Sequence, residues 1–233
     1  KSGLIQGNSV EKTAESGIYL SSSSYDGANG CQGFLVSQNH LNRCANNTLL
    51  CIGGRNNTIS GNVCRNGYNA AVQLWHCVET QIVGNQIEKC NTKDWSGKGT
   101  LGDAWSGGIA VDGDTNIVVA DTTYQCKIFD NKITECGQGR AALNFAIRVM
   151  NDPYVGGHKV YCEGNMSNGA DVHFRRDEAV PLATMQSREP SGNRKNDNFR
   201  VVTVTQAGDT TLLADDWLVI ISHDAISSVT ATL

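Results

Sequence analysis

Three aspartates lie where the sequence departs from its own repeating pattern. Asp112 and Asp114 follow the apolar segment 109–111, and Asp103 lies in the Gly-rich segment before it. Residues two apart on an extended strand share one face, roughly 6–7 Å apart at Cβ. Hydrolysis of a glycosidic bond needs two carboxyl groups, about 5–5.5 Å apart for retention or about 6.5–9.5 Å for inversion. We therefore predict Asp112 and Asp114 as a catalytic pair, with Asp103 as a third carboxylate.

The same aspartates have two other interpretations. Asp-Gly-Asp is common in solvated turns, where it has no catalytic role. The segment 112–116 also resembles the start of a calcium-binding loop, but no glutamate follows at the position that closes such a loop. We predict no metal and no cofactor.

Aromatic side chains accompany these carboxylates. Trp95 and Trp105 flank the Gly-rich segment, while Tyr25, Asp26 and Tyr154 lie on two further interruptions of the pattern. Indole and phenol rings stack on sugar rings while their polar edges stay in water. We predict these five as substrate-binding residues. The alternative for the tryptophans is that they pack the segment onto the scaffold, and packing is the favoured role of Trp75.

Arg148 completes the predicted substrate-binding set. A lyase would need a cation that stabilises an enolate and a base that titrates near neutrality. Arg148 and His76 could take these roles, with Tyr154 as the acid, but nothing in the sequence places them together, and a lone histidine is usually structural or surface-exposed. No serine-hydrolase, nucleotide-binding or zinc-protease motif occurs.

Asparagines recur at a fixed interval and identify the scaffold. Asn39, Asn62 and Asn85 are 23 residues apart, each with an apolar residue three positions before and two positions after. The frame recurs at Asn8, Asn131 and, more weakly, Asn165. A repeat of this length is typical of a solenoid.

The repeat predicts stacked coils of short β-strands. Glycine precedes most of these asparagines, and both residue types tolerate the left-handed backbone of a sharp corner. Coils about 4.8 Å apart would place each asparagine over the next, so that the amides bond along the stack. A series of β-hairpins is the alternative, which the Gly-Asn order disfavours.

Insertions and cysteines refine this prediction. The step from Asn85 to Asn131 is 46 residues, which fits two coils or one coil with an insertion; we favour the insertion, because residues 91–108 lack the frame. We expect function at the interruptions 21–30, 91–108, 112–125 and 150–157. We interpret most of the nine cysteines as free interior thiols, suited to a reducing compartment, with one or two disulfides as the alternative.

Composition and charge limit the partners. The net charge of −4 argues against binding to nucleic acid. No apolar run approaches the roughly 18 residues of a membrane span, and no signal-peptide pattern is present. We expect neither nucleic-acid binding nor membrane insertion.

Three regions are predicted along the chain. Residues 1–178 form the solenoid, as the carboxyl-terminal part of a longer one. Residues 179–198 have the composition of a linker. Residues 199–233 alternate like strands and form a β module too small to bury a core alone.

Two features together carry a family resemblance. The coils resemble right-handed parallel β-helix proteins of the pectate-lyase type. The final segment, TLLADDWLVIISHDAISSVTATL, is similar to the small β module that ends many bacteriophage tailspikes. The resemblance implies an all-β fold, a right-handed parallel β-helix followed by a β module that drives trimerisation. The family's amino-terminal virion-binding part is absent from this sequence, and we expect several early coils to be absent as well; catalytic residues from those parts would be absent with them.

The resemblance also implies a function. Such proteins are assembled in the bacterial cytoplasm, carried on the virion tail, and bind and often cleave capsular or O-antigen polysaccharide. We expect endo-cleavage of such a glycan by carboxylate-mediated hydrolysis, performed by a homotrimer. The alternatives are a non-catalytic fragment for receptor binding or trimer assembly, and a polysaccharide lyase.

Overall fold

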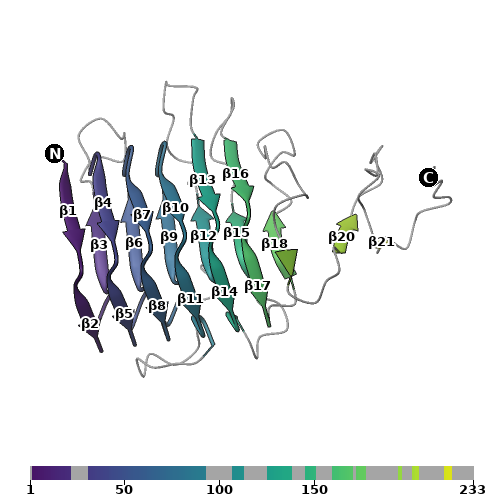
Figure 1. Cartoon of the computed structure of the whole chain (residues 1–233), viewed down its shortest axis with the longest axis horizontal. Helices are drawn as coiled ribbons and strands as arrows, with labels where there is room; N and C mark the ends of the chain where they lie inside the picture. Colours follow the sequence, from purple (N-terminus) through teal and green to yellow (C-terminus); the bar gives the residue numbers. More distant parts are fainter. Residues whose placement is uncertain are drawn as a thin grey trace.

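The structure, a computed structural model, is all-β and stacks parallel strands along its long axis (Figure 1). It describes residues 2–21, 31–92, 107–112, 125–137, 145–150, 159–169, 172–176, 194–195, 201–204 and 218–221. In these residues the strands form three stacked parallel sets, here called sheets A, B and C, compatible with a parallel β-helix.

Each sheet takes one strand from every coil. Sheet A contains, in spatial order, β1 (Gly3–Gln6), β4 (Phe34–Ser37), β7 (Thr58–Ser60), β10 (Gln81–Val83), β13 (Gln125–Phe129) and β16 (Lys159–Glu163). Sheet B contains β2 (Ser9–Glu11), β5 (His40–Asn42), β8 (Val63–Arg65), β11 (Gln86–Glu88), β14 (Lys132–Thr134), β17 (Met166–Asn168) and β19 (Arg194–Lys195). Sheet C contains β3 (Ile18–Ser21), β6 (Leu49–Ile52), β9 (Val72–Trp75), β12 (Ile109–Asp112), β15 (Phe145–Met150) and β18 (Val172–Arg176).

The predicted asparagine column is confirmed. The backbone N–H and side-chain Nδ2 of Asn62 both donate to Oδ1 of Asn85, at 2.9 and 3.0 Å. Nδ2 of Asn62 also donates to the carbonyl oxygen of Val36, at 3.0 Å. The same pair of bonds links every step from Asn8 to Asn165. All but the first asparagine are buried, so the column satisfies the polar groups of a corner that water does not reach.

The corner has a fixed conformation as well as fixed bonds. Between sheets A and B the chain always turns through two residues, and the first of them has a positive φ. Glycine occupies this position at Gly61 (φ 62°). Because glycine has no Cβ, it adopts the left-handed backbone without steric cost. Gln38 (φ 55°) and Asp130 (φ 53°) adopt the same conformation. The stacked corner therefore imposes the left-handed backbone even where the residue does not favour it.

The interior is filled by aligned columns of apolar side chains. Val36, Ile59, Ile82 and Ile128 stack in sheet A, and each is fully buried. Sheets B and C contribute matching columns to the same cluster. Because every column repeats at the strand spacing, each side chain packs against its equivalents one coil above and below.

The cysteines belong to this interior, as predicted. All nine are free thiols, and all except the partly exposed Cys31 are buried. Burial raises the pKa of Cys64 and of Cys126 to about 12. The thiols therefore act as small apolar side chains, since the reactive thiolate is strongly disfavoured.

The long step between Asn85 and Asn131 is one coil, as the sequence analysis favoured. Strand β10 pairs directly with β13, and β11 pairs directly with β14. No further coil therefore lies between these paired strands.

Two short strand pairs follow the coils. In the range predicted as a linker, β19 pairs in parallel with β17. In the range predicted as a β module, β20 (Val201–Val204) pairs in parallel with β21 (Leu218–Ile221). The predicted strands at 211–213 and 229–233 lie outside the described residues, and the domain boundaries stay predictions.

The asparagine column gives a first testable prediction. Replacing Asn62 by alanine leaves the buried N–H of Asn39 without its acceptor and removes two donated bonds. Since one buried unsatisfied group costs about 1–3 kcal/mol, we expect Asn62→Ala to lower the free energy of unfolding by at least about 2 kcal/mol. The measurement is urea denaturation. Asn42→Ala is the matched control, because its side-chain bonds are not fully buried: Nδ2 donates to Glu11 in an exposed bond, and Oδ1 accepts a partly buried bond from Asn66. Equal losses would contradict the role of the column.

The buried thiols give a second prediction. At about pH 8, a thiol reagent should label only Cys31 quickly in the native protein, and all nine cysteines after denaturation. The free energy of unfolding should also fall as pH rises from about 9 towards 12. The reason is that the pKa of Cys64 is about 12 when folded against an ordinary value of 9.0, so the unfolded chain ionises first.

The matched variant for this pH effect is Cys64→Val, which retains a small apolar side chain. Its loss of stability between about pH 8 and pH 10 should be smaller than that of the wild type. Fast labelling of several native cysteines would refute the interior placement.

Candidate functional site on the outer face of sheet C

Variation in coil length is confined to the two ends of the sheet C strands. Corners between sheets A and B never change, as described above. The connection from sheet B to sheet C occupies 43–48 in one coil and 89–108 in another. The connection from sheet C to sheet A occupies 53–57 in one coil and 113–124 in another. In the described part of the chain, the coils are therefore interrupted only at the two ends of the sheet C strands, here called the edges of sheet C.

Most of the predicted site residues belong to these connections. Tyr25 and Asp26 follow β3, Asp114 follows β12, Tyr154 follows β15, and Trp95, Asp103 and Trp105 precede β12. All of them lie outside the described residues, so their roles stay predictions. The strands to which they attach are described, and every one is in sheet C.

Asp112 is the predicted catalytic residue that lies on a described strand. It ends β12, in register with Trp75 of β9 on one side and Met150 of β15 on the other. The segment 109–111 thus continues as a strand through Asp112, as the sequence analysis assumed. Asp114 lies beyond the described part of this strand.

The outer face of sheet C differs from those of the other two sheets. Leu49 and Val72 belong to the interior cluster, so their neighbours Leu50 and Gln73 point outward. Leu50, Gln73 and Ala110 lie in one row across the sheet and are only 8%, 1% and 0% exposed. Equivalent outward residues of sheets A and B include exposed Leu35, Gln81, Gln86 and Lys132. The centre of the outer face of sheet C is therefore shielded from solvent.

Trp75 lies on this outer face, two residues after Gln73. Its side chain is half-buried, next in register to Ile52 and Asp112. The indole ring stacks on the imidazole of buried His76, with ring centroids 5.3 Å apart and planes at 27°. Part of the ring surface is therefore used within the protein.

Arg148 lies on the same sheet, one strand beyond Asp112. It pairs in register with Ala110 of β12 and Arg175 of β18, and its side chain is half-buried. Strand β12 separates it from β9, which precedes His76, so the two strands are about 10 Å apart. Arg148 is therefore in register with Ala110, two residues before Asp112. It lies two strands away from β9, after which His76, the candidate lyase base, follows.

Gln73 is a residue that the sequence analysis did not single out. Neither its Nε2 nor its Oε1 has a hydrogen-bond partner, although the side chain is buried. A buried amide without partners costs about 1–3 kcal/mol. The available signal was a single glutamine within the apolar strand Val72–Trp75, where the outward position would normally be apolar or exposed.

Comparison with known protein families, curated proteins and solved structures found no match.

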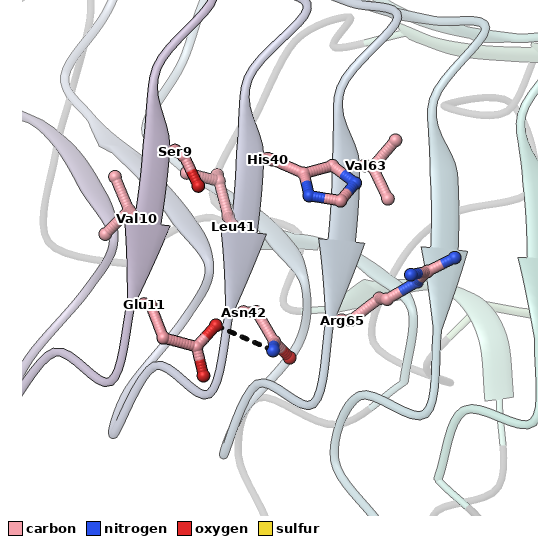
Figure 2. A pocket seen from close by; sticks show the side chains of 8 residues that line it. All are labelled: Ser9, Val10, Glu11, His40, Leu41, Asn42, Val63 and Arg65. Carbon is pink, nitrogen blue, oxygen red and sulfur yellow. Dashed lines mark hydrogen bonds between the residues drawn. The ribbon is translucent and has the colours of Figure 1, made fainter.

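A small hollow lies on the outer face of sheet B. It has a volume of about 60 Å³ and lies between the first coils. Figure 2 shows the side chains that line it, among them Asn42, whose Nδ2 donates to Glu11 at 2.8 Å. Arg65 extends away from this pair towards the next coil, where it forms an ion pair with Glu88 at 3.1 Å. The hollow is well below the 300–1,000 Å³ of typical ligand pockets. Two of its polar side chains, Glu11 and Asn42, bond to each other, as expected of a solvated face.

The part of the chain that the structure describes contains neither a metal-binding cluster nor a candidate membrane helix. No group of three or more His, Cys, Asp or Glu side chains there is arranged to hold a metal ion. No helix in the same part of the chain is long and apolar enough to cross a bilayer.

Proposed function

We propose that this protein binds a bacterial surface polysaccharide along the outer face of sheet C and cleaves within the glycan chain. The observation that carries the proposal is the confinement of the long connections to the two edges of that sheet. Those connections hold the carboxylates and aromatic residues predicted from the sequence. A rigid sheet bordered by variable connections is a common arrangement for recognition.

The dimensions of the sheet suit an extended ligand. From β3 to β15 there are four strand steps, or about 19 Å at the usual spacing. The connection with Tyr25 and Asp26 starts at one end of this span, and that with Tyr154 starts at the other. A polymer lying across the strands could contact both, whereas a single sugar could not.

The proposed chemistry is hydrolysis by two carboxyl groups. Asp112 and Asp114 would act as acid and base, with Asp103 as a third carboxylate. Trp95, Trp105 and the two tyrosines would stack on sugar rings, and Arg148 would bind polar groups of the substrate.

The proposed assembly is that of a phage tailspike. The coils would form a right-handed parallel β-helix, and three chains would associate through residues 199–233. The homotrimer would assemble in the bacterial cytoplasm and be carried on the virion tail. Supporting this, the coils are parallel and ladder-linked, and strands β20 and β21 in the predicted module pair with each other.

The catalytic proposal predicts that Asp112→Asn reduces cleavage by about 10²–10⁴-fold, the usual contribution of a general acid or base. The measurement is the chain length of a capsular or O-antigen polysaccharide after incubation, with new reducing ends as the second readout. Asp130→Asn is the control, because Asp130 is exposed at a corner between sheets A and B. An unchanged rate for Asp112→Asn would remove this residue from the site.

The same assay separates the alternative functions. Binding without shortening by the wild type would indicate a receptor-binding fragment. An unsaturated product that absorbs in the ultraviolet would indicate elimination by a lyase, and its absence would indicate hydrolysis.

The assembly proposal predicts that deleting residues 199–233 converts trimers into monomers. The described coils pair strand to strand within one chain, so the remaining protein should keep its β-rich circular dichroism spectrum. Light scattering measures the mass. A trimer that persists after the deletion would show that these residues do not drive association.

A further inference from the structure

The outer face of sheet A presents apolar side chains over its whole length. Because the interior column of this sheet points inward, the residues next to it in each strand point outward. Leu4 and Leu35 lie side by side in register on this face and are 61% and 39% exposed. Val83, Phe129 and Tyr161 continue the apolar surface on later coils, where each is half-buried. The described chain leaves the two leucines in contact with water, so covering them would be favourable.

The outer face of sheet B is different, because its charged side chains pair along the stack. Arg65 forms an ion pair with Glu88 at 3.1 Å, and Lys89, in the corner that follows β11, forms one with Glu135 at 3.5 Å. The centres of protein interfaces are depleted in charged residues. Of these two faces, sheet A is therefore the one suited to contact another protein chain.

Sheet A carries one cation and one anion at its carboxyl-terminal end. Lys127 is in register with Tyr161, and Glu163 is in register with Phe129. Neither charged residue takes part in an ion pair among the described residues. The two lie on neighbouring strands, about 4.8 Å apart along the stack, a distance that a lysine side chain can span. This patch of opposite charges and aromatic rings is complementary to a second copy of itself.

Resting on the proposed homotrimer, we infer that the outer face of sheet A is the surface through which the coils of the three chains pack against one another. Around a threefold axis parallel to the stack, equivalent residues of the three chains lie at the same height. Leu35 then packs near its equivalents, and Lys127 of one chain pairs with Glu163 of the next. The outer faces of sheets B and C stay free, and with them the edges of sheet C.

The size of this face explains why a separate module would be needed for association. From β1 to β16 there are five strand steps, or about 24 Å. With strands of three to five residues, the face covers on the order of 250–400 Å². A stable interface usually buries about 800 Å² per partner. The sheet A faces therefore pack only while residues 199–233 hold the chains together, in agreement with the monomers expected after their deletion.

The test is cross-linking of the full chain at two matched glutamines. Gln81 and Gln86 begin consecutive strands of one coil, on sheets A and B, and both are exposed. Each is changed to cysteine in a Cys31→Ser background, which removes the partly exposed native thiol and leaves the buried ones. A short bismaleimide should join Gln81→Cys chains into covalent dimers on a denaturing gel. Gln86→Cys chains should stay single, because sheet B faces away from the axis.

Charge reversal tests the contact between Lys127 and Glu163. In the Gln81→Cys background, Lys127→Glu or Glu163→Lys alone places like charges opposite each other and should lower the yield of dimers at least about threefold. The double variant Lys127→Glu/Glu163→Lys restores opposite charges and should restore the yield. A double variant that cross-links no better than the single variants would overturn the inferred packing.

The outcomes separate this inference from the assembly on which it rests. Equal cross-linking of Gln81→Cys and Gln86→Cys, or none in either, would overturn the sheet A interface while the trimer stands. If light scattering gives a monomer for the wild type, the proposed homotrimer fails, and the interface fails with it. Dimers from Gln81→Cys alone, together with rescue by the double charge reversal, support the inference.

Discussion

The bonded column of asparagine side chains is the constraint on which the rest of the structure depends. Each of the central asparagines donates two hydrogen bonds to the next and accepts two from the one before. These groups are buried, so a break in the column would leave several of them unsatisfied at once. The corner between sheets A and B therefore keeps the same length and the same backbone conformation in every coil. Added residues can leave the stack only at the ends of the sheet C strands.

This constraint divides the molecule into a scaffold and a variable surface. On sheets A and B, inward apolar residues alternate with outward residues that are mostly exposed or half-buried, as along Thr58–Ser60 and Gln86–Glu88. On sheet C the strands β6 and β9 are buried on both faces at their centres. A polar residue in a strand that is buried on both faces lowers stability unless its side chain is hydrogen-bonded. Gln73 is such a residue in β9.

The sequence predicted the scaffold because the scaffold repeats. The spacing of Asn39, Asn62 and Asn85 was sufficient to predict the column, the strands around it and the interior position of the cysteines. The long step to Asn131 was correctly assigned to one coil because residues 91–108 break the frame. Repetition supplies several copies of the same physical problem, so one pattern can be checked against the next.

The candidate site was harder to predict because its segments do not repeat. Each insertion occurs once, and no second copy in the chain reveals which residues are essential. Asp112 was predicted because it follows a strand that matches the repeat, and its functional role stays a prediction. The unpaired amide of Gln73 could not be predicted, because a missing hydrogen bond is visible only when the neighbours Leu50 and Ala110 are known. The left-handed backbone at Gln38 likewise depends on the coils stacked on either side.

The fixed two-residue corner also determines how such a molecule can change its length. Growth along the axis is possible only in complete turns, from one asparagine to its equivalent, because a partial turn would misalign every column beyond it. When a complete turn is duplicated or deleted, by contrast, the neighbouring coils present the same interior columns to each other. The stack therefore continues with its columns aligned. The connections at the ends of the sheet C strands do not follow this rule, since they can lengthen by one residue at a time. Descendants of such a chain would differ by whole turns along the axis and by single residues at the ends of the sheet C strands.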